Sequence, residues 1–327
     1  MTTATPTRAI FDRLPALADL VPFVALADGL PTPVHQVEDR LWVLRDDYTS
    51  SAYGGNKVRK LEFLLPVAER RGGPVVTAGG IGSHHVVAVA TFAKRLGLRT
   101  EAVLYPQPVT EDVRHVQAQL RRLGVVATAA THRYYTPLVL TRRLAALAPE
   151  RPYLILPGAS TPLGALGYVS AGLELVHAFS GLGEREPDVV VAPLGSGGTA
   201  VGLAIGIALG GWRDTSVVGV RAGDAVIANR AVLGSLEAMT AALVALGGWR
   251  PRAARWTVDS RWVGRGYGYP TAEGRAAAAV ASMWGIAVEP TYTAKACAAA
   301  LDLAATGKRV VYIHTSAGAN PQVSPRS

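Results

Sequence analysis

Short apolar, β-rich runs alternate along the chain with longer stretches in which apolar positions recur every three or four residues. The short runs predict strands and the longer stretches predict amphipathic helices. This alternation is typical of a mostly parallel sheet covered by helices on both faces, so the sequence predicts an α/β fold. The predicted strands are residues 74–77, 100–105, 125–128, 153–156, 189–194, 216–220 and 309–314. The predicted helices are residues 57–70, 83–96, 112–123, 138–147, 271–284 and 294–305, with another after residue 198.

The predicted elements fall into two sets, which indicates two lobes. The first set runs from residue 74 to residue 156, and the second begins at residue 189. The helix over 57–70 has one apolar face, which is expected to be buried even if Pro66 kinks the helix. Its apolar positions are Val58, Leu61, Leu64, Leu65 and Val67.

Composition predicts a globular protein without a membrane segment. With 49% hydrophobic and 17% charged residues among 327, the chain can bury a substantial core. The longest apolar runs, residues 189–194 and 201–209, are too short or too interrupted by glycine to cross a bilayer of roughly 30 Å. Residues 1–12 lack the apolar stretch of a secretory signal, so we expect a cytoplasmic location.

Charge and cysteine content exclude two further classes of protein. The net charge of +9 is scattered, and its densest groups lack the interleaved aromatic residues that stack on bases, so we expect no nucleic-acid partner. Cys297 is the single cysteine, which excludes an intramolecular disulfide and a cysteine zinc cluster. Its alanine-rich surroundings predict a buried helical position.

Lysine is rare enough to draw attention to the places where it occurs. Only five of the 33 basic residues are lysines, and two of them lie in the run Gly54-Gly55-Asn56-Lys57-Val58-Arg59-Lys60. The glycines allow close approach of a ligand, and the charges of Arg59 and Lys60 are expected to lower the pKa of Lys57. A neutral amine can attack a carbonyl, which arginine cannot do. The alternative is a glycine turn that precedes a helix with solvated lysines.

A second motif, Gly79-Gly80-Ile81-Gly82-Ser83-His84-His85, joins a predicted strand to a predicted helix. Free backbone N–H groups and the helix dipole make such a turn suitable for an anion. Ser83 is expected to cap the helix, or to hold a substrate carboxylate. His84 and His85 are neighbours and therefore point apart, and no third ligand is evident, so we expect no metal. Proton transfer or carboxylate contact is the expected role of the two histidines.

The third motif, Gly195-Ser196-Gly197-Gly198-Thr199, is again placed between a strand and a helix and predicts a phosphate-binding loop. With Ala200 it also satisfies the dinucleotide-binding pattern. The next strand ends at Arg221 without an acidic residue for a ribose hydroxyl, but Arg221 could bind a 2′-phosphate. A nicotinamide enzyme therefore stays open on these residues alone, whereas the absence of a Walker A sequence disfavours nucleotide hydrolysis.

Taken together, the three motifs resemble the fold type II pyridoxal-phosphate enzymes, and more narrowly the branch that contains D-cysteine desulfhydrase and 1-aminocyclopropane-1-carboxylate deaminase. The run Gly-Gly-Asn-Lys-x-Arg-Lys-Leu-Glu is the specific match. The matching stretches are residues 30–34, 45–47, 54–65, 79–98, 157–168, 189–202, 266–270, 289–295 and 314–315. The resemblance implies a two-lobed fold like that of the tryptophan synthase β subunit, with a small domain of residues 53–167, a large cofactor-binding domain of residues 1–52 and 168–327, and a homodimer.

The resemblance also implies roles for individual residues. Lys57 would hold pyridoxal 5′-phosphate as an internal aldimine and later carry the α-proton of the substrate. Lys60 and the loop from Gly195 to Thr199 would hold the phosphate. The remaining cofactor-binding residues would be Asn56, His84, Tyr292, Thr293 and Thr315, with the two threonines near the pyridine nitrogen. A small amino acid would contact Ser83, His84, His85 and Tyr267, of which Ser83 and Tyr267 would also be catalytic together with Lys57 and Tyr292.

The residue after the stacking tyrosine favours one reaction within this branch. The deaminases have a carboxylate there, which keeps the pyridine nitrogen protonated, whereas this chain has Thr293. A neutral hydroxyl favours α,β-elimination of a good leaving group, as in D-cysteine desulfhydrase. Two departures from the family, His84 in place of asparagine and residues 315–320 in place of Thr-Gly-Gly-Ala-Pro, leave a related deamination or β-replacement as the alternative. A non-catalytic cofactor-binding protein is the third possibility.

Overall fold

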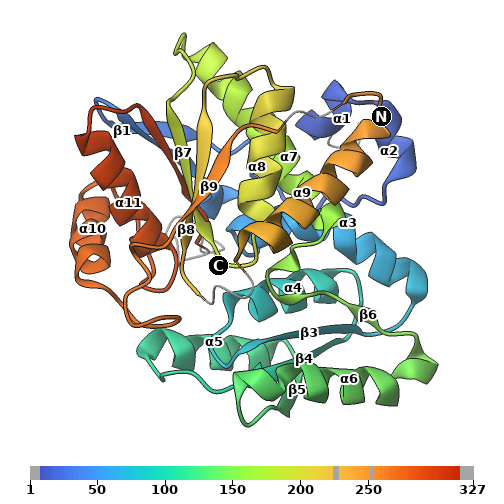
Figure 1. The fold of residues 1–327 in the computed structure, drawn as a ribbon. Coiled ribbons are helices and arrows are strands. Elements are labelled where there is room, and N and C mark those ends of the chain that lie inside the picture. Colours follow the sequence, from blue (N-terminus) through green and yellow to red (C-terminus); the bar gives the residue numbers. More distant parts are fainter. Residues whose placement is uncertain (1–7, 224–227, 251–252, 317–327) are drawn as a thin grey trace.

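Two separate sheets, each flanked by helices, make up the protein (Figure 1). The structure, a computed structural model, describes residues 8–223, 228–250 and 253–316. The larger sheet has the strand order β1-β2-β10-β7-β8-β9, and the smaller has the order β5-β4-β3-β6. All neighbouring strands are parallel except the antiparallel pair β1 and β2. The predicted α/β class and its mostly parallel sheets are confirmed.

The larger sheet draws its strands from both ends of the sequence, whereas the smaller sheet is continuous in sequence. The large-sheet strands are β1 (Val34–Glu38), β2 (Leu41–Arg45), β7 (Val189–Leu194), β8 (Ser216–Arg221), β9 (Trp256–Asp259) and β10 (Val310–His314). The small-sheet strands are β3 (Val75–Gly80), β4 (Thr100–Tyr105), β5 (Val126–Ala129) and β6 (Tyr153–Leu154). This arrangement agrees with two lobes, and the domain boundaries at residues 52 and 167 stay a prediction.

The helices include every one that the sequence predicts. Their bounds are α1 (Ala9–Arg13), α2 (Ala16–Leu20), α3 (Asn56–Arg71), α4 (His84–Arg95), α5 (Glu111–Arg122), α6 (Thr136–Ala146), α7 (Pro162–Gly181), α8 (Gly198–Leu209), α9 (Arg230–Ala245), α10 (Ala272–Met283) and α11 (Thr293–Ala305). The α3 helix runs on through Pro66, and Cys297 is buried in α11, as predicted.

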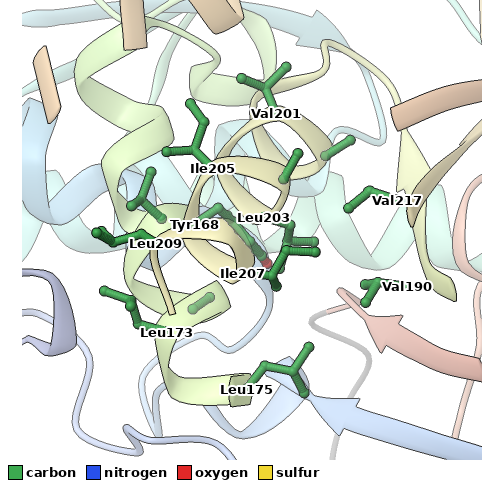
Figure 2. Packing of buried hydrophobic residues seen from close by; sticks show 14 of the residues in the cluster. Tyr168, Leu173, Leu175, Val190, Val201, Leu203, Ile205, Ile207, Leu209 and Val217 are labelled. Carbon is green, nitrogen blue, oxygen red and sulfur yellow. The ribbon is translucent and has the colours of Figure 1, made fainter. Parts of the chain in front are cut away.

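The sequence analysis missed the helices α1, α2, α7 and α9 and the strands β1, β2 and β9. The longest of these, α7, is buried around most of its circumference and therefore lacks the alternation of apolar and polar faces that identifies a helix. It packs against α8, and together they form the centre of the large-lobe core, with Leu173 of α7 and Ile205 of α8 among the residues in Figure 2. A Cβ on Gly172 would lie 2.8 Å from the Cα of Gly206, so the two helices touch through their backbones.

Buried ion pairs fix α3, the helix that carries Lys57, to the large lobe. Arg59 is 1% exposed, and its guanidinium lies 2.9 Å from Asp46 and 2.9 Å from Glu174 of α7. Burial alone would lower the pKa of Arg59, but the charges of Asp46 and Glu174 raise it above its ordinary value. One turn further, Glu62 pairs with Arg8 and accepts hydrogen bonds from two backbone N–H groups at residues 26 and 27. The orientation of α3 is therefore set by side chains on the side opposite to its lysines.

We predict that Arg59→Met lowers the free energy of unfolding by about 3–5 kcal/mol, because it leaves two carboxylates buried without their cation. Urea denaturation of the purified variant would measure this change. The control is Arg70→Met, which removes an exposed arginine from the same helix and should change stability by less than about 0.5 kcal/mol. Equal effects of the two substitutions would contradict the anchoring role of Arg59.

Candidate active site

Asn56 joins the start of α3 to the two segments beside it. Gly55 has a φ of 87° and allows the sharp turn into the helix. The Asn56 N–H donates to the carbonyl of Thr315 at 3.2 Å, and its side-chain amide donates to the Thr199 hydroxyl at 3.2 Å. The Lys57 ammonium donates to the Asn56 Oδ1 at 2.5 Å. Three of the predicted site segments therefore meet at the first turn of α3.

Lys57 has a depressed pKa, as the sequence analysis predicts, but for a different reason. Burial lowers its pKa to about 8, and the negative charge of Glu289 opposes this shift. Arg59 does not supply the effect, because its charge is matched by Asp46 and Glu174. Lys60 is also buried, and its pKa is lowered well below the ordinary value by desolvation and then by the charge of Lys57. The amine of Lys57 is thus tuned towards its neutral, nucleophilic form by its surroundings.

Lys60 and the glycine loop before α8 form a cradle for an anion. The Lys60 ammonium lies 3.1 Å from the carbonyl oxygen of Gly158 and 3.3 Å from the hydroxyl of Ser160. The Ser160 hydroxyl also accepts from the N–H of Gly198 at 3.0 Å and lies 2.7 Å from the hydroxyl of Ser196. These donors surround the N-terminus of α8, where the helix dipole favours negative charge. The sequence analysis named this loop and Lys60 but missed Ser160.

Tyr292 and Tyr267 stand together at the other end of the same loop. The Tyr292 ring comes within 3.1 Å of the point that a Cβ on Gly195 would occupy, so the missing side chain makes room for the ring. The ring centroids of Tyr267 and Tyr292 are 5.8 Å apart with an angle of 71° between the planes. Burial raises the pKa of both phenols, whose hydroxyls are hydrogen-bonded to each other. Tyr267 also bonds to Tyr105 at the end of β4 in the small lobe.

Two residues missed by the sequence analysis hold this tyrosine pair in place. Lys295, fully buried in α11, donates to the carbonyl oxygens of Val263 at 2.9 Å and Gly266 at 3.3 Å, and so fixes the loop that carries Tyr267. Tyr105 brings a small-lobe hydroxyl to the same tyrosines. The signal for Lys295 was its position among only five lysines, whereas nothing local indicates that Tyr105 meets Tyr267.

The second glycine motif places its serine and histidines in three different environments. Ser83 caps α4, as predicted, and accepts from the N–H of Val86 at 3.4 Å. His85 is 7% exposed, and its Nε2 lies 3.0 Å from the Thr77 hydroxyl. That hydroxyl donates to a carbonyl, so Nε2 of His85 must be the protonated nitrogen. Among the described residues, the buried Nδ1 of His85 has no hydrogen-bond partner.

His85 is electrostatically part of the lysine site, whereas His84 is turned elsewhere. Burial lowers the pKa of His85 well below its ordinary value, and the charges of Lys57 and Lys60 lower it further, so the ring is neutral. The ring of His84 instead lies 2.7 Å from the Tyr53 hydroxyl and 3.1 Å from Asp112. With both nitrogens used, His84 has no ring nitrogen free for the cofactor contact that the sequence analysis expected. Within the described ranges, no cluster of three or more His, Cys, Asp or Glu side chains could hold a metal ion.

Thr293 is buried beside Glu289, and its hydroxyl is committed to the backbone of that residue. The hydroxyl accepts from the N–H of Glu289 at 2.7 Å and lies 3.3 Å from its carbonyl oxygen. The Glu289 carboxylate in turn accepts the N–H groups of Thr291, Tyr292 and Thr293. A threonine hydroxyl thus takes the position after Tyr292, and Glu289, whose charge also acts on Lys57, caps α11. Residues 317–320 of the predicted site wall lie outside the described residues.

These residues fit pyridoxal phosphate. A buried amine of low pKa stands next to a cradle formed by Lys60, Ser160 and the N-terminus of α8, with aromatic rings beside the loop. In the part of the chain that the structure describes, the Nδ1 of His85 is a buried ring nitrogen without a protein partner. In holding the cofactor, Lys57 would bind its aldehyde, while Lys60, Ser160 and the loop from Gly195 to Thr199 would bind its phosphate.

The fold and the lysine site define an α/β enzyme of the kind that uses a reactive lysine next to a phosphate loop. Residues 27–316 match the family described as "Pyridoxal-phosphate dependent enzyme", and the chain belongs to this family. Family membership favours pyridoxal phosphate over a dinucleotide as the cofactor, and the role of the Gly195 loop stays a prediction. It also agrees with the resemblance stated from the motifs.

Desulfhydrases and deaminases are among the relatives and solved structures that are similar to this chain. The chain is 34% identical to a D-cysteine desulfhydrase of Klebsiella pneumoniae (strain 342), over 88% of this chain and 92% of the relative. It is 36% identical to a D-cysteine desulfhydrase of Yersinia pestis (strain Pestoides F), over 80% of each chain. A crystal structure of an ACC deaminase homologue is 28% identical and superposes with a TM-score of 0.78, covering 96% of both chains. A T.th. threonine deaminase, 19% identical with a TM-score of 0.61 over 95% of this chain and 97% of its own, shares the fold.

We predict that Lys57 reacts with the cofactor with a pH midpoint near 8. Only the neutral amine attacks an aldehyde, and at pH 7 about one in ten of such amines is neutral, against about one in three thousand for an ordinary lysine. The rate at which the visible band forms after mixing apoprotein with pyridoxal phosphate should therefore rise about tenfold from pH 7 and level off above pH 8. Glu289→Gln should lower the midpoint, because it removes the charge that raises the pKa. A midpoint near 10.5 would contradict the buried environment of the amine.

A second prediction concerns the glycine that lets the anion approach. In Gly198→Ala, the new Cβ would lie 2.7 Å from the Ser160 hydroxyl and 3.2 Å from the Lys60 ammonium. We expect the Kd for pyridoxal phosphate, measured by fluorescence titration, to rise by at least tenfold. Gly234→Ala is the matched control, since this helical glycine has no neighbour within 4 Å of its ideal Cβ, and it should bind normally. Unchanged binding by Gly198→Ala would show that the phosphate lies elsewhere.

Proposed function

We propose that the protein catalyses the α,β-elimination of a small amino acid that carries a good leaving group on its β-carbon, with D-cysteine as the first candidate substrate. The observation that carries this proposal is the residue after Tyr292. Thr293 presents a neutral hydroxyl that is already used by the backbone of Glu289, in place of a carboxylate directed at the ring nitrogen. A less protonated ring withdraws fewer electrons, which suits the loss of a thiolate better than the opening of a carbon ring.

The relatives support the same choice of reaction. Both D-cysteine desulfhydrases cited above share about a third of their residues with this chain over most of its length. The solved structure with the TM-score of 0.78 is an ACC deaminase homologue, so ring-opening deamination is the alternative within this branch.

Each side chain of the site has its own role in the proposed reaction. The bound cofactor supplies an aldehyde that takes up the substrate amine and a ring that accepts electrons. Lys57, released from the aldehyde, removes the α-proton, and its depressed pKa prepares it to act as a base near neutral pH. Ser83 and the neutral His85 bind the substrate on the small-lobe side, where the unpaired Nδ1 of His85 accepts a donor from it. Tyr267 and Tyr292 enclose the opposite side.

The net reaction balances with one water molecule. The Cα–H bond and the bond from the β-carbon to its leaving group break, the enamine that leaves the enzyme is hydrolysed, and the products are pyruvate, ammonia and the protonated leaving group. For cysteine the leaving group is released as hydrogen sulfide. No oxidant or reductant is needed, so the residues described and the cofactor suffice.

Product analysis tests this proposal. The holoenzyme is incubated with D-cysteine, L-cysteine, β-chloroalanine or 1-aminocyclopropane-1-carboxylate, and the oxo-acid products are identified. We expect pyruvate from a β-substituted alanine, with at least a thousandfold loss in Lys57→Ala together with the visible band of the lysine-bound cofactor. Formation of 2-oxobutyrate from the cyclopropane acid, without pyruvate from the others, would establish ring-opening deamination instead. A replacement reaction would show itself by a new amino acid formed without ammonia.

We also propose that the protein acts as a homodimer in the cytoplasm. Large apolar side chains in α2, in α9 and directly after α9 are between 44% and 59% exposed, and a second copy would cover them; they are Leu20, Val232, Met239 and Leu246. No helix in the described ranges is long and apolar enough to span a membrane. The lone thiol of Cys297 is buried, which raises its pKa to about 12 and makes it unreactive. Light scattering of the purified protein would show the oligomeric state.

A further inference from the structure

His84 joins three segments through a single imidazole. Its Nε2 lies 3.1 Å from a carboxylate oxygen of Asp112, in the first turn of α5, and its Nδ1 lies 2.7 Å from the hydroxyl of Tyr53. A carboxylate accepts and cannot donate, so Nε2 must carry the proton. In the neutral ring Nδ1 then accepts the hydroxyl hydrogen of Tyr53. The partners thus assign both the tautomer and the direction of each hydrogen bond.

The charges around His84 support this assignment. Hydrogen bonding to His84 is the main cause that lowers the pKa of Asp112, and the nearby His115 lowers it further, so Asp112 stays an acceptor. Burial, and then the charge of Asp112, raise the pKa of Tyr53, so its phenol keeps the proton that it donates. Asp112 is 57% exposed and His84 33% exposed, while the Tyr53 ring packs against the apolar cluster beneath α4 and α5.

The chain of three residues connects the two glycine turns of the site. Tyr53 directly precedes Gly54 and Gly55, after which α3 begins and presents Lys57. His84 directly follows Ser83, the cap of α4, and precedes the buried His85. Each turn is held by backbone hydrogen bonds, such as the one from the Gly55 N–H to the Asp46 carbonyl at 2.7 Å, but the position of one turn relative to the other needs a bond between them. The hydrogen bond between Tyr53 and His84 is such a bond, and it links the lysine segment to the serine turn directly.

We propose that His84 is a positioning residue that sets the distance between Lys57 and the substrate-side groups Ser83 and His85, with Asp112 holding its ring in the required tautomer. The imidazole itself touches neither cofactor nor substrate. Asparagine, which the family has at this position, has no side-chain atom as far from the backbone as Nε2 and so cannot bond to Tyr53 and Asp112 together. This inference rests on the proposed placement of Lys57 and Ser83 in the site, but it does not depend on the identity of the amino-acid substrate.

Variants can break each of the two hydrogen bonds separately. His84→Gln keeps a donor that can reach Asp112, in the place of Nε2, but loses the acceptor for the Tyr53 hydroxyl. His84→Asn keeps an acceptor for Tyr53, in the place of Nδ1, but loses the hydrogen bond to Asp112. Tyr53→Phe removes the donor and leaves the ring packing in place. The readout is the rate constant at which apoprotein and pyridoxal phosphate form the visible band, because it reports how Lys57 is presented and needs no turnover.

We expect Tyr53→Phe and His84→Gln each to slow band formation by roughly 3- to 30-fold. The double variant should be no slower than the slower single variant, because both substitutions break the same bond. His84→Asn, which keeps the Tyr53 contact, should lose less than His84→Gln. His35→Gln, at an exposed histidine of β1, is the matched control and should react at the wild-type rate.

A second measurement separates positioning from a general loss of structure. Nitrogen NMR of the histidine rings in the apoprotein should show His84 protonated at Nε2 and unprotonated at Nδ1, and Asp112→Ala should convert it to a mixture of tautomers. Multiplicative slowing in the double variant, or a His84 ring protonated at Nδ1, would overturn the proposal. Absence of pyruvate from every substrate would refute the proposed elimination while leaving these results intact.

Discussion

The buried pairing of Arg59 with Asp46 is the interaction on which the site depends. Removing two charges from water is costly, and the cost is met here by saturating Asp46 with donors from Thr32, Arg59 and Tyr168. The pair fixes the rotation of α3 about its axis. One face of the helix is thereby held to the large lobe, and the opposite positions, Lys57 and Lys60, are directed to the ligand side.

The distribution of carboxylates around α3 explains why its lysines are available for chemistry. Asp46, Glu62 and Glu174 are paired with arginines, and Asp47 is paired with Arg45. Lys57 and Lys60 are left with neutral oxygens of Asn56, Gly158 and Ser160 as their hydrogen-bond acceptors. Among the described residues, no carboxylate forms an ion pair with either amine, although the more distant charge of Glu289 acts on Lys57. A phosphorylated aldehyde would supply a negative charge to this site through its phosphate, and its aldehyde would react with one of the two amines. Binding would therefore reduce the excess of positive charge around α3.

The sequence predicted those parts of the fold and site that are encoded locally. Strands such as residues 189–194 and the glycine turns before α4 and α8 are short-range patterns, and Lys57 stood out by its neighbours. The helix α7 was missed because it is buried on most sides and therefore has no polar face in its sequence pattern. The sequence analysis did not predict the roles of Ser160, Tyr105 and Lys295, because these roles depend on contacts between segments that are distant in sequence. The predicted cause of the depressed Lys57 pKa was wrong for the same reason. Arg59 is close to Lys57 in sequence, but its charge is neutralised by Asp46 and Glu174, which come from distant segments.

The helix α3 lies between the two groups of side chains that make up the site. Lys57, Lys60, Ser160 and the Gly198 turn are tied to α7 and α8, whose backbones touch at Gly172 and Gly206. Ser83 and His85 lie at the start of α4, and Tyr105 is the last residue of β4. The two groups are joined, because Leu61 and Leu65 of α3 pack in one apolar cluster with Phe92 of α4, and because Tyr53 bonds to His84. The lysine helix is therefore a shared support for both halves of the site, and any shift of it would displace the glycine loop of the large lobe and the serine turn of the small lobe together.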